Sequence, residues 1–184
     1  ASVNFLNCHD GFTLWDMYCY SHKHNEANGW NNTDGTDDNR SWNCGWEGET
    51  DNENINKLRL RLCKNAMTTL LLSRGAPMFL AGDEFLNTQF GNNNTYCQDS
   101  PISWLEWDQL EKNREHFRFT RYLIKFRNEH PVIRKHMGGC SLGFPDSWAL
   151  GPDHTNVLRV IFAGRNADNT ADDIVCVAIN VHWE

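Results

Sequence analysis

The chain has 184 residues and a formal net charge of −7 at pH 7. Its 17 Lys and Arg residues are scattered, which excludes the basic surface that nucleic acids and anionic lipids require. No apolar run approaches the roughly 20 residues that a membrane-spanning helix needs, and the first residues lack a signal-peptide pattern. We therefore expect a cytoplasmic protein whose partner is neither nucleic acid nor membrane.

The cysteines and tryptophans give the next indications. Seven cysteines form no Cys-x-x-Cys pair and are an odd number, so reduced thiols in a cytoplasmic protein are the simpler interpretation. Eight Trp accompany an Asn-rich middle segment. Aromatic faces beside amides and carboxylates suit a sugar, which offers apolar C–H faces and hydroxyls, although aromatic residues mostly fill cores.

The first half of the chain predicts the order strand, polar turn, helix. A buried strand is expected at residues 2–8, and it runs directly into His9-Asp10-Gly11. After a long loop at 22–49 with almost no aliphatic residue, Thr50-Asp-Asn-Glu53 resembles a capping box. Apolar residues then recur at three- and four-residue spacing and predict a helix that ends near Ser73.

The same order then repeats. A second short strand is expected at 77–81, and a second loop at 87–102 leads to a helix from about Gln109 to Asn128. After Pro131 the pattern changes to β-rich runs at 157–163 and 174–181. Strands alternating with helices predict an α/β fold with a parallel sheet, followed by a separate β domain.

The His9-Asp10 pair follows directly after a predicted strand. This is the place where α/β barrels carry their working side chains. From the residues alone, such a pair is more often a turn or a hydrogen-bonded pair than a catalytic site.

Longer segments resemble a known family. The stretches SVNFLNCHDGFTLWDMYCYSHKHNEANG, NNTDGTDDNRSWNCGWEG, LLLSRGAPMFLAGDE and GNNNTYCQDSPISW together are similar to isoamylase-type glycogen debranching enzymes of glycoside hydrolase family 13, in the alpha-amylase superfamily. The resemblance covers about residues 2–130. It implies that residues 1–131 are the C-terminal part of a (β/α)8 TIM barrel, its last two β/α units. Residues 132–184 would begin a C-terminal antiparallel β-sandwich domain.

The resemblance also implies roles for single residues. Asp10 matches the third catalytic carboxylate of the family, and His9 matches a residue that contacts the sugar. A carboxylate that grips hydroxyls of a distorted sugar stabilises an oxocarbenium-like transition state. The nucleophile and the acid/base belong to earlier strands outside this chain. Asp83 and Glu84 are paired carboxylates at a strand end, but the resemblance gives them a structural or rim role.

The two long loops supply further candidates for substrate contact: Arg40, Trp42, Asn94 and Tyr96. Their alternative is a scaffold, in which Arg40 pairs with a loop Asp and Trp42 packs beneath the loop.

Metal and thiol chemistry receive little support. His22 and His24 lack a recognisable third zinc ligand, and residues 32–35 fail the EF-hand pattern. Nothing in the sequence places a base beside Cys8 or Cys19. Neither a metal nor a cofactor is expected.

Together these points predict that the parent protein hydrolyses α-1,6-glucosidic branches by a retaining mechanism. Its partner would be an α-glucan such as glycogen, limit dextrin or maltooligosaccharide. The chain alone is expected to be inactive and to self-associate through an incomplete barrel surface. The alternatives are a non-catalytic α-glucan-binding module and a purely structural fragment.

Overall fold

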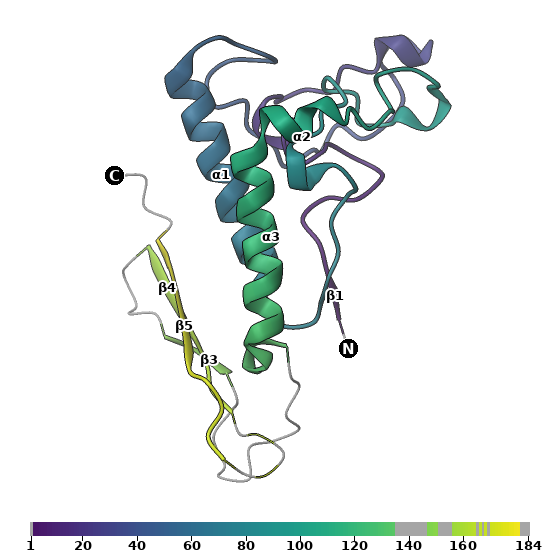
Figure 1. Ribbon diagram of the computed structural model, residues 1–184. Coiled ribbons are helices and arrows are strands. Elements are labelled where there is room, and N and C mark those ends of the chain that lie inside the picture. The colour runs from purple at the N-terminus through teal and green to yellow at the C-terminus, as the bar shows by residue number, and fades with distance from the viewer. Residues whose placement is uncertain are drawn as a thin grey trace.

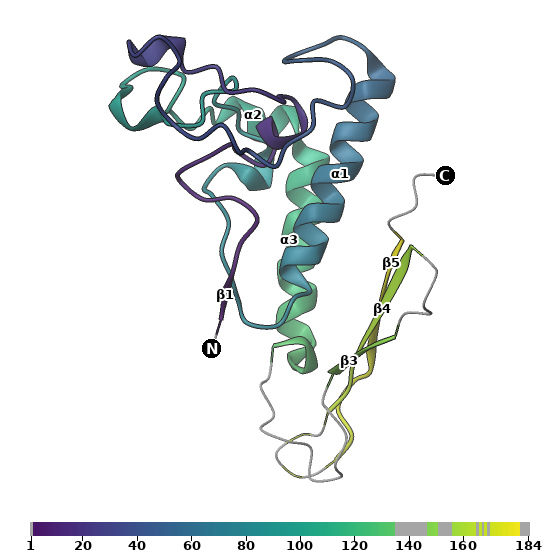
Figure 2. The ribbon, with the colours of Figure 1, turned by 180° about the vertical axis from the view of Figure 1, so that it is seen from behind.

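The computed structural model describes residues 2–134, 147–150, 156–164, 166, 168 and 170–180. The described chain forms three layers, seen edge-on in Figure 1 and from behind in Figure 2. Two short strands form the first layer, two long helices the second, and a three-stranded sheet the third. The α/β fold class is confirmed for the first two layers.

The first layer is a parallel pair of strands, β1 (Val3–Asn4) and β2 (Ala76–Pro77). Backbone hydrogen bonds from Ala76 N to Ser2 O (2.9 Å) and from Met78 N to Asn4 O (2.8 Å) fix their register. Both strands were predicted, but their regular pairing is shorter than expected, and the prediction of a buried first strand is wrong, since Val3 is 61% exposed. Within the described residues each strand pairs only with the other, so little of either is held in a ladder.

The helix α1 (Glu53–Leu71) follows the first long loop. Its cap is Asn52, whose side chain accepts hydrogen bonds from the amides of Asn54 and Ile55. The predicted capping box is therefore wrong. The Thr50 hydroxyl accepts instead from the Asn52 amide, which lies outside the helix.

The predicted helix from 109 to 128 is two helices, α2 (Asp108–Lys112) and α3 (Arg114–Glu129). They break at Asn113, whose φ of −105° and ψ of 29° are not helical. Its side-chain amide donates to Phe85 O at 2.9 Å, which draws the backbone toward the turn after β2. The break was not predicted because this contact joins residues distant in sequence.

The helices α1 and α3 lie side by side and enclose the main apolar core (Figures 1 and 2). Its buried members come from both helices and from the loops after each strand: Leu14, Cys63, Ala66, Met67, Leu71, Leu86 and Leu123. The described residues also form five short 3-10 helices: η1 (Asp16–Tyr18), η2 (Glu26–Asn28), η3 (Asp83–Phe85), η4 (Thr95–Cys97) and η5 (Pro131–Ile133). None of the helices in the described ranges is long and apolar enough to cross a membrane.

The third layer is an antiparallel sheet in the order β3-β4-β5, with β3 at Ser147–Leu150, β4 at Val157–Phe162 and β5 at Val175–Asn180. The last two strands match the predicted β-rich runs except that Ala163 and Ile174 lie just outside them, and Val181 lies outside the described residues. The strand β3 was not predicted. A second apolar cluster joins Val132, Ile133 and Phe162 to Leu72 and Phe126 on the helical side.

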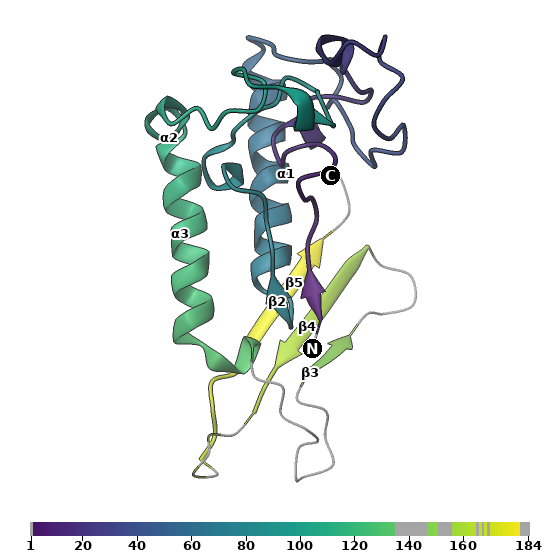
Figure 3. The same ribbon diagram turned by 90° about the vertical axis from the view of Figure 1, so that its right-hand side faces the viewer.

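The long loops gather at one end of the molecule, the end toward which β1 and β2 both point (Figure 3). Because both strands run in the same direction, the residues that follow each of them meet at this end. The fold thus brings residues 8–50 and 82–107 together above the helices.

Arg127 ties the other end of the helical layer together. Its buried guanidinium donates to Leu71 O and to Ser73 O, both at 2.7 Å, and also to Gly75 O. These carbonyls lie at the end of α1 and in the turn that leads to β2. A single charged side chain therefore satisfies three backbone carbonyls of this connection.

We predict that Arg127→Met lowers the free energy of unfolding by about 2–4 kcal/mol, because it leaves one buried and two part-buried hydrogen bonds to carbonyls unmade. Urea denaturation measures the loss. Arg121→Met, at an exposed position on the same helix, is the control and should change stability by less than about 0.5 kcal/mol. Equal losses in the two variants would contradict the role given to Arg127.

Candidate functional site

The His9-Asp10-Gly11 turn follows β1 at the loop end of the molecule. The side chains of His9 and Asp10 are 84% and 78% exposed, and His9 Nε2 lies 3.3 Å from Asp10 Oδ2. Gly11 has a φ of +111°, a conformation that L side chains rarely adopt, and its amide donates to Asn93 O at 2.9 Å. The second loop therefore holds the turn, and both side chains remain open to a ligand.

Asp83 anchors the segments on either side of this turn. Its carboxylate accepts from Asn7 Nδ2 (2.8 Å) before the turn and from the Leu14 amide (2.8 Å) after it. It also accepts from the Leu80 amide at the end of the second strand segment (3.1 Å), and the side chain is buried. These contacts match the structural role expected for Asp83. Glu84 accepts from the Gly82 amide within its own turn.

Asp16 is a second buried carboxylate, and sequence reasoning missed it. It accepts from the Thr88 hydroxyl, from the Gln89 amide at 2.8 Å and from the Gly91 amide at 3.4 Å. Complete burial raises the pKa of Asp16 to about 6, and these hydrogen bonds offset part of the rise. Asp16 thus fixes the start of the second loop against the segment after the His9-Asp10 turn.

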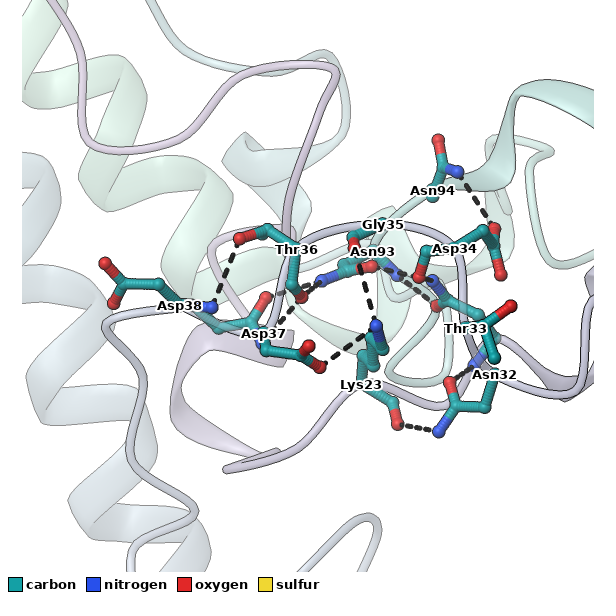
Figure 4. A network of polar contacts seen from close by, with 12 residues as sticks. Lys23, Asn32, Thr33, Asp34, Gly35, Thr36, Asp37, Asp38, Asn93 and Asn94 are labelled. Atoms are coloured by element: carbon teal, nitrogen blue, oxygen red, sulfur yellow. Dashed lines mark hydrogen bonds and ion pairs between the residues drawn. The ribbon is translucent and has the colours of Figure 1, made fainter.

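An asparagine network joins the two loops (Figure 4). Asn25 and Asn93 are both buried and bond to each other. Asn25 Nδ2 donates to Asn93 Oδ1 at 2.8 Å, and the backbone N–H of Asn93 donates to Asn25 Oδ1 at 2.9 Å. Asn28 donates to Asn94 O and accepts from Asn92 Nδ2, both at 2.8 Å. The Asn-rich composition was the only sequence signal for this network, because its pairs are far apart in the chain.

Glu47 bonds the end of the first long loop back to its beginning. Its carboxylate accepts from the amides of Ser21 and His22 and from Asn43 Nδ2, and it lies 3.2 Å from His24 Nε2. Partial burial is the largest single influence on the pKa of this carboxylate, and by itself it raises the pKa because it disfavours the charged form. The hydrogen bonds together outweigh it and lower the pKa of Glu47 to about 2.

The predicted substrate residues of the first loop have different environments. Arg40 Nε lies 2.7 Å from Asp38 Oδ1, which is the scaffold pairing considered as its alternative. Trp42 does not pack beneath the loop: it is 52% exposed, and its backbone amide donates to Met17 O. Its indole is therefore accessible.

The two candidates of the second loop also differ. Asn94 Nδ2 donates to Asp34 Oδ2 at 2.9 Å, so its amide belongs to the asparagine network. Tyr96 is 74% exposed. Asn93 links the Asn94 segment to the His9-Asp10 turn. Within the described ranges, no hydrogen bond or ion pair joins Arg40, Trp42 or Tyr96 to that turn.

Two residues near the site, His24 and Cys19, lie in structural environments. His24 packs edge-on against Tyr20 and contacts Glu47. Burial raises the pKa of the Cys19 thiol, which disfavours the reactive thiolate. In the part of the chain that the structure describes, no three His, Cys, Asp or Glu side chains form a group that could hold a metal ion.

We predict that the free energy of unfolding of the wild type falls relative to Asp16→Asn as pH rises from about 4 to about 6. The folded-state pKa of Asp16, about 6, exceeds the ordinary 3.8. Between these pH values the folded state holds a proton on Asp16 that the unfolded state has lost, and the stabilisation that this proton gives disappears as pH rises. The relative loss should be on the order of 2–3 kcal/mol. Denaturation across this pH range measures it.

Asp51→Asn is the control for this comparison, because it removes a carboxylate at an exposed position. A wild-type difference from Asp16→Asn that does not change between pH 4 and pH 6 would contradict the buried titration.

Sequence comparison finds several relatives. The chain is 52% identical over 135 residues to the glycogen operon protein GlgX homolog of Mycobacterium bovis, covering 73% of this chain and 19% of the relative. It is 52% identical over 136 residues to the glycogen debranching enzyme of Dickeya chrysanthemi (73% and 20%), and 51% over 134 residues to isoamylase 3, chloroplastic, of Oryza sativa (72% and 17%). No protein-family model matches the chain.

Solved structures share the fold. A pullulanase from Paenibacillus barengoltzii in complex with maltohexaose and alpha-cyclodextrin superposes with a TM-score of 0.65 at 21% identity, over 98% of this chain and 23% of the pullulanase. Pullulanase type I from Bacillus subtilis with maltose gives 0.66 at 22% identity, over 97% and 20%. The chain spans about a fifth of the length of the curated relatives that it matches. Identity near 50% confirms that this chain is a relative of the isoamylase-type glycogen debranching enzymes over the region that they share.

Proposed function

We propose that the full-length protein containing this chain hydrolyses α-1,6-glucosidic branch linkages in glycogen or a related α-glucan, with retention of configuration. The observation that carries the proposal is the exposed His9-Asp10 pair at the end of β1, on a turn that Asn93 and Asp83 hold from both sides. The similarity to proteins named glycogen debranching enzyme and isoamylase supports it.

In this proposal residues 1–131 contribute the last two β/α units of a (β/α)8 barrel, and residues 132–184 begin a β-sandwich domain. The parallel pairing of β1 and β2 and the helix after each strand segment support this assignment. The loops after the strands then lie at the carboxyl-terminal face of the barrel, where barrel enzymes carry their active sites.

Asp10 would act as the third carboxylate of the reaction. As the glycosidic bond breaks, positive charge develops on the sugar ring, and hydrogen bonds from its hydroxyls to Asp10 strengthen in the transition state. His9 would donate to a neighbouring hydroxyl. The nucleophilic Asp and the acid/base Glu would come from earlier strands of the full-length protein.

The exposed aromatic faces of Trp42 and Tyr96 support contact with glucose units, whose C–H faces pack against flat rings. Arg40 and Asn94 would contact substrate only beside their present partners, Asp38 and Asp34. The maltooligosaccharides bound to the structurally similar pullulanases support an α-glucan as the ligand of this face.

We predict that Asp10→Asn in the full-length protein lowers kcat for glycogen by about 10²-fold or more, because the amide cannot supply the same charge to the transition state. Release of reducing ends measures the rate. Asp51→Asn is the control and should keep wild-type activity. The 184-residue chain by itself should release none.

An unchanged rate in Asp10→Asn would make His9-Asp10 a structural turn. A wild type that binds maltooligosaccharide without cleaving glycogen would support a binding module instead.

We predict that the 184-residue chain by itself self-associates through the apolar surface around β1 and β2. Val3, Phe5, Leu6 and Met78 are exposed there. Sedimentation velocity at micromolar concentration should show a dimer or a larger species. Phe5→Lys should shift the chain toward monomer, whereas Tyr122→Lys, at an exposed aromatic on α3, should not. A compact wild-type monomer would contradict this prediction.

A further inference from the structure

We propose that the first long loop carries a separate pocket for one glucosyl unit of an α-glucan chain, beside the site of cleavage. The pocket has a volume of about 280 Å³ and is lined by His22, Lys23, Asn32, Asp37 and Asn39. This inference rests on the proposed function, because the glucan is its ligand. It adds a binding site that is distinct from the His9-Asp10 turn.

The lining defines the chemistry of the ligand. All five residues are polar, so the pocket offers an apolar molecule no surface to bury against. Lys23 Nζ lies 3.0 Å from Asp37 Oδ1, and this pair leaves the pocket close to neutral. A phosphate or another anion would meet the carboxylate of Asp37. A neutral ligand rich in hydroxyls meets both donors and acceptors.

Lys23 and Asp37 are placed to recognise adjacent hydroxyls. The Lys23 side chain is only 8% exposed, and its ammonium contacts Asp37 Oδ1 and Gly35 O (3.4 Å). A third N–H remains for a ligand, since an ammonium has three donors. Asp37 is 90% exposed and can accept from a hydroxyl with its second oxygen. Two vicinal hydroxyls of a glucose ring fit this arrangement, one accepting from Lys23 and the other donating to Asp37.

The walls of the pocket are held before any ligand binds. Asn32 Oδ1 accepts from the Asn25 amide at 2.8 Å, and its Nδ2 donates to Lys23 O at 3.0 Å. Asn39 Oδ1 accepts from Asn93 Nδ2 at 2.6 Å. Figure 4 shows Lys23, Asp37 and Asn93 within this network. A preformed pocket avoids the entropic cost of ordering its loop on binding.

Asn93 connects the pocket to the candidate catalytic turn. Its backbone carbonyl accepts from the Gly11 amide at 2.9 Å, and its side chain donates to Asn39 in the pocket wall. Along this hydrogen-bond path, Asn93 is the single residue between the turn and the pocket wall. In this proposal a glucan chain held at the turn places another of its units in the pocket, which would strengthen binding of chains long enough to reach both.

The test compares four forms of the full-length protein: wild type, Asp37→Asn, His22→Ala and Asp51→Ala. Asp37→Asn keeps the size of the side chain, and His22→Ala leaves the Lys23–Asp37 pair intact. Asp51→Ala removes an exposed carboxylate outside the pocket and is the matched control. Calorimetric titration with maltohexaose measures Kd without turnover, since this linear sugar has no branch linkage. Thermal melting verifies that each variant is folded.

We expect Kd for maltohexaose to rise about fivefold or more in Asp37→Asn and in His22→Ala, as for loss of a hydrogen bond to a ligand, and to stay at the wild-type value in Asp51→Ala. The KM for glycogen should rise with it. Values equal to the control in both folded pocket variants would overturn the pocket. Failure of the wild type to cleave glycogen would instead overturn the proposed function, while a change in Kd would still support the pocket.

Discussion

The two long loops depend on buried hydrogen bonds, because their sequences contain almost no aliphatic residues that could form a core. Asn25 and Asn93 show how this is achieved: each is buried, and each satisfies the other's polar groups as well as nearby backbone. Buried amides without partners would cost more than they contribute, so such a network is stable only when it is nearly complete. The position of the His9-Asp10 turn depends on this condition through Asn93.

Two buried carboxylates extend the same principle to the ends of the strands. Asp83 collects donors from the segments that flank the turn, and Asp16 collects donors from the start of the second loop. Burial raises the pKa of each to about 6. Their charges are unfavourable inside the protein, but each joins backbone segments that no apolar contact could align. Burial of these two carboxylates lowers stability, but their hydrogen bonds fix the arrangement of the loops.

The sequence predicted those features that depend on local patterns. Helix α1, the strand positions and the polar turn at His9-Asp10 follow from periodicity and from turn residues. It did not predict the break at Asn113 or the role of Asp16, because each depends on a partner distant in the chain. The cap at Asn52 was missed because Thr50 offered an equally good local pattern. Patterns report neighbours in sequence, whereas loop geometry is set by neighbours in space.

The asparagine network also bears on chemical ageing. Asn28 precedes Gly29, and an asparagine before glycine deamidates readily in a flexible chain because the next amide can attack its side chain. In the folded loop, Asn28 Nδ2 donates to Asp34 Oδ2 and Asn94 O, and the Gly29 amide donates to Glu26 O. In the folded loop both reacting groups are thus engaged in other hydrogen bonds. Conversion of Asn28 to aspartate would place its carboxylate beside that of Asp34 and would remove the hydrogen bond to Asn94 that links the two loops. The folded loop therefore protects the asparagine on which its own contact with the second loop depends.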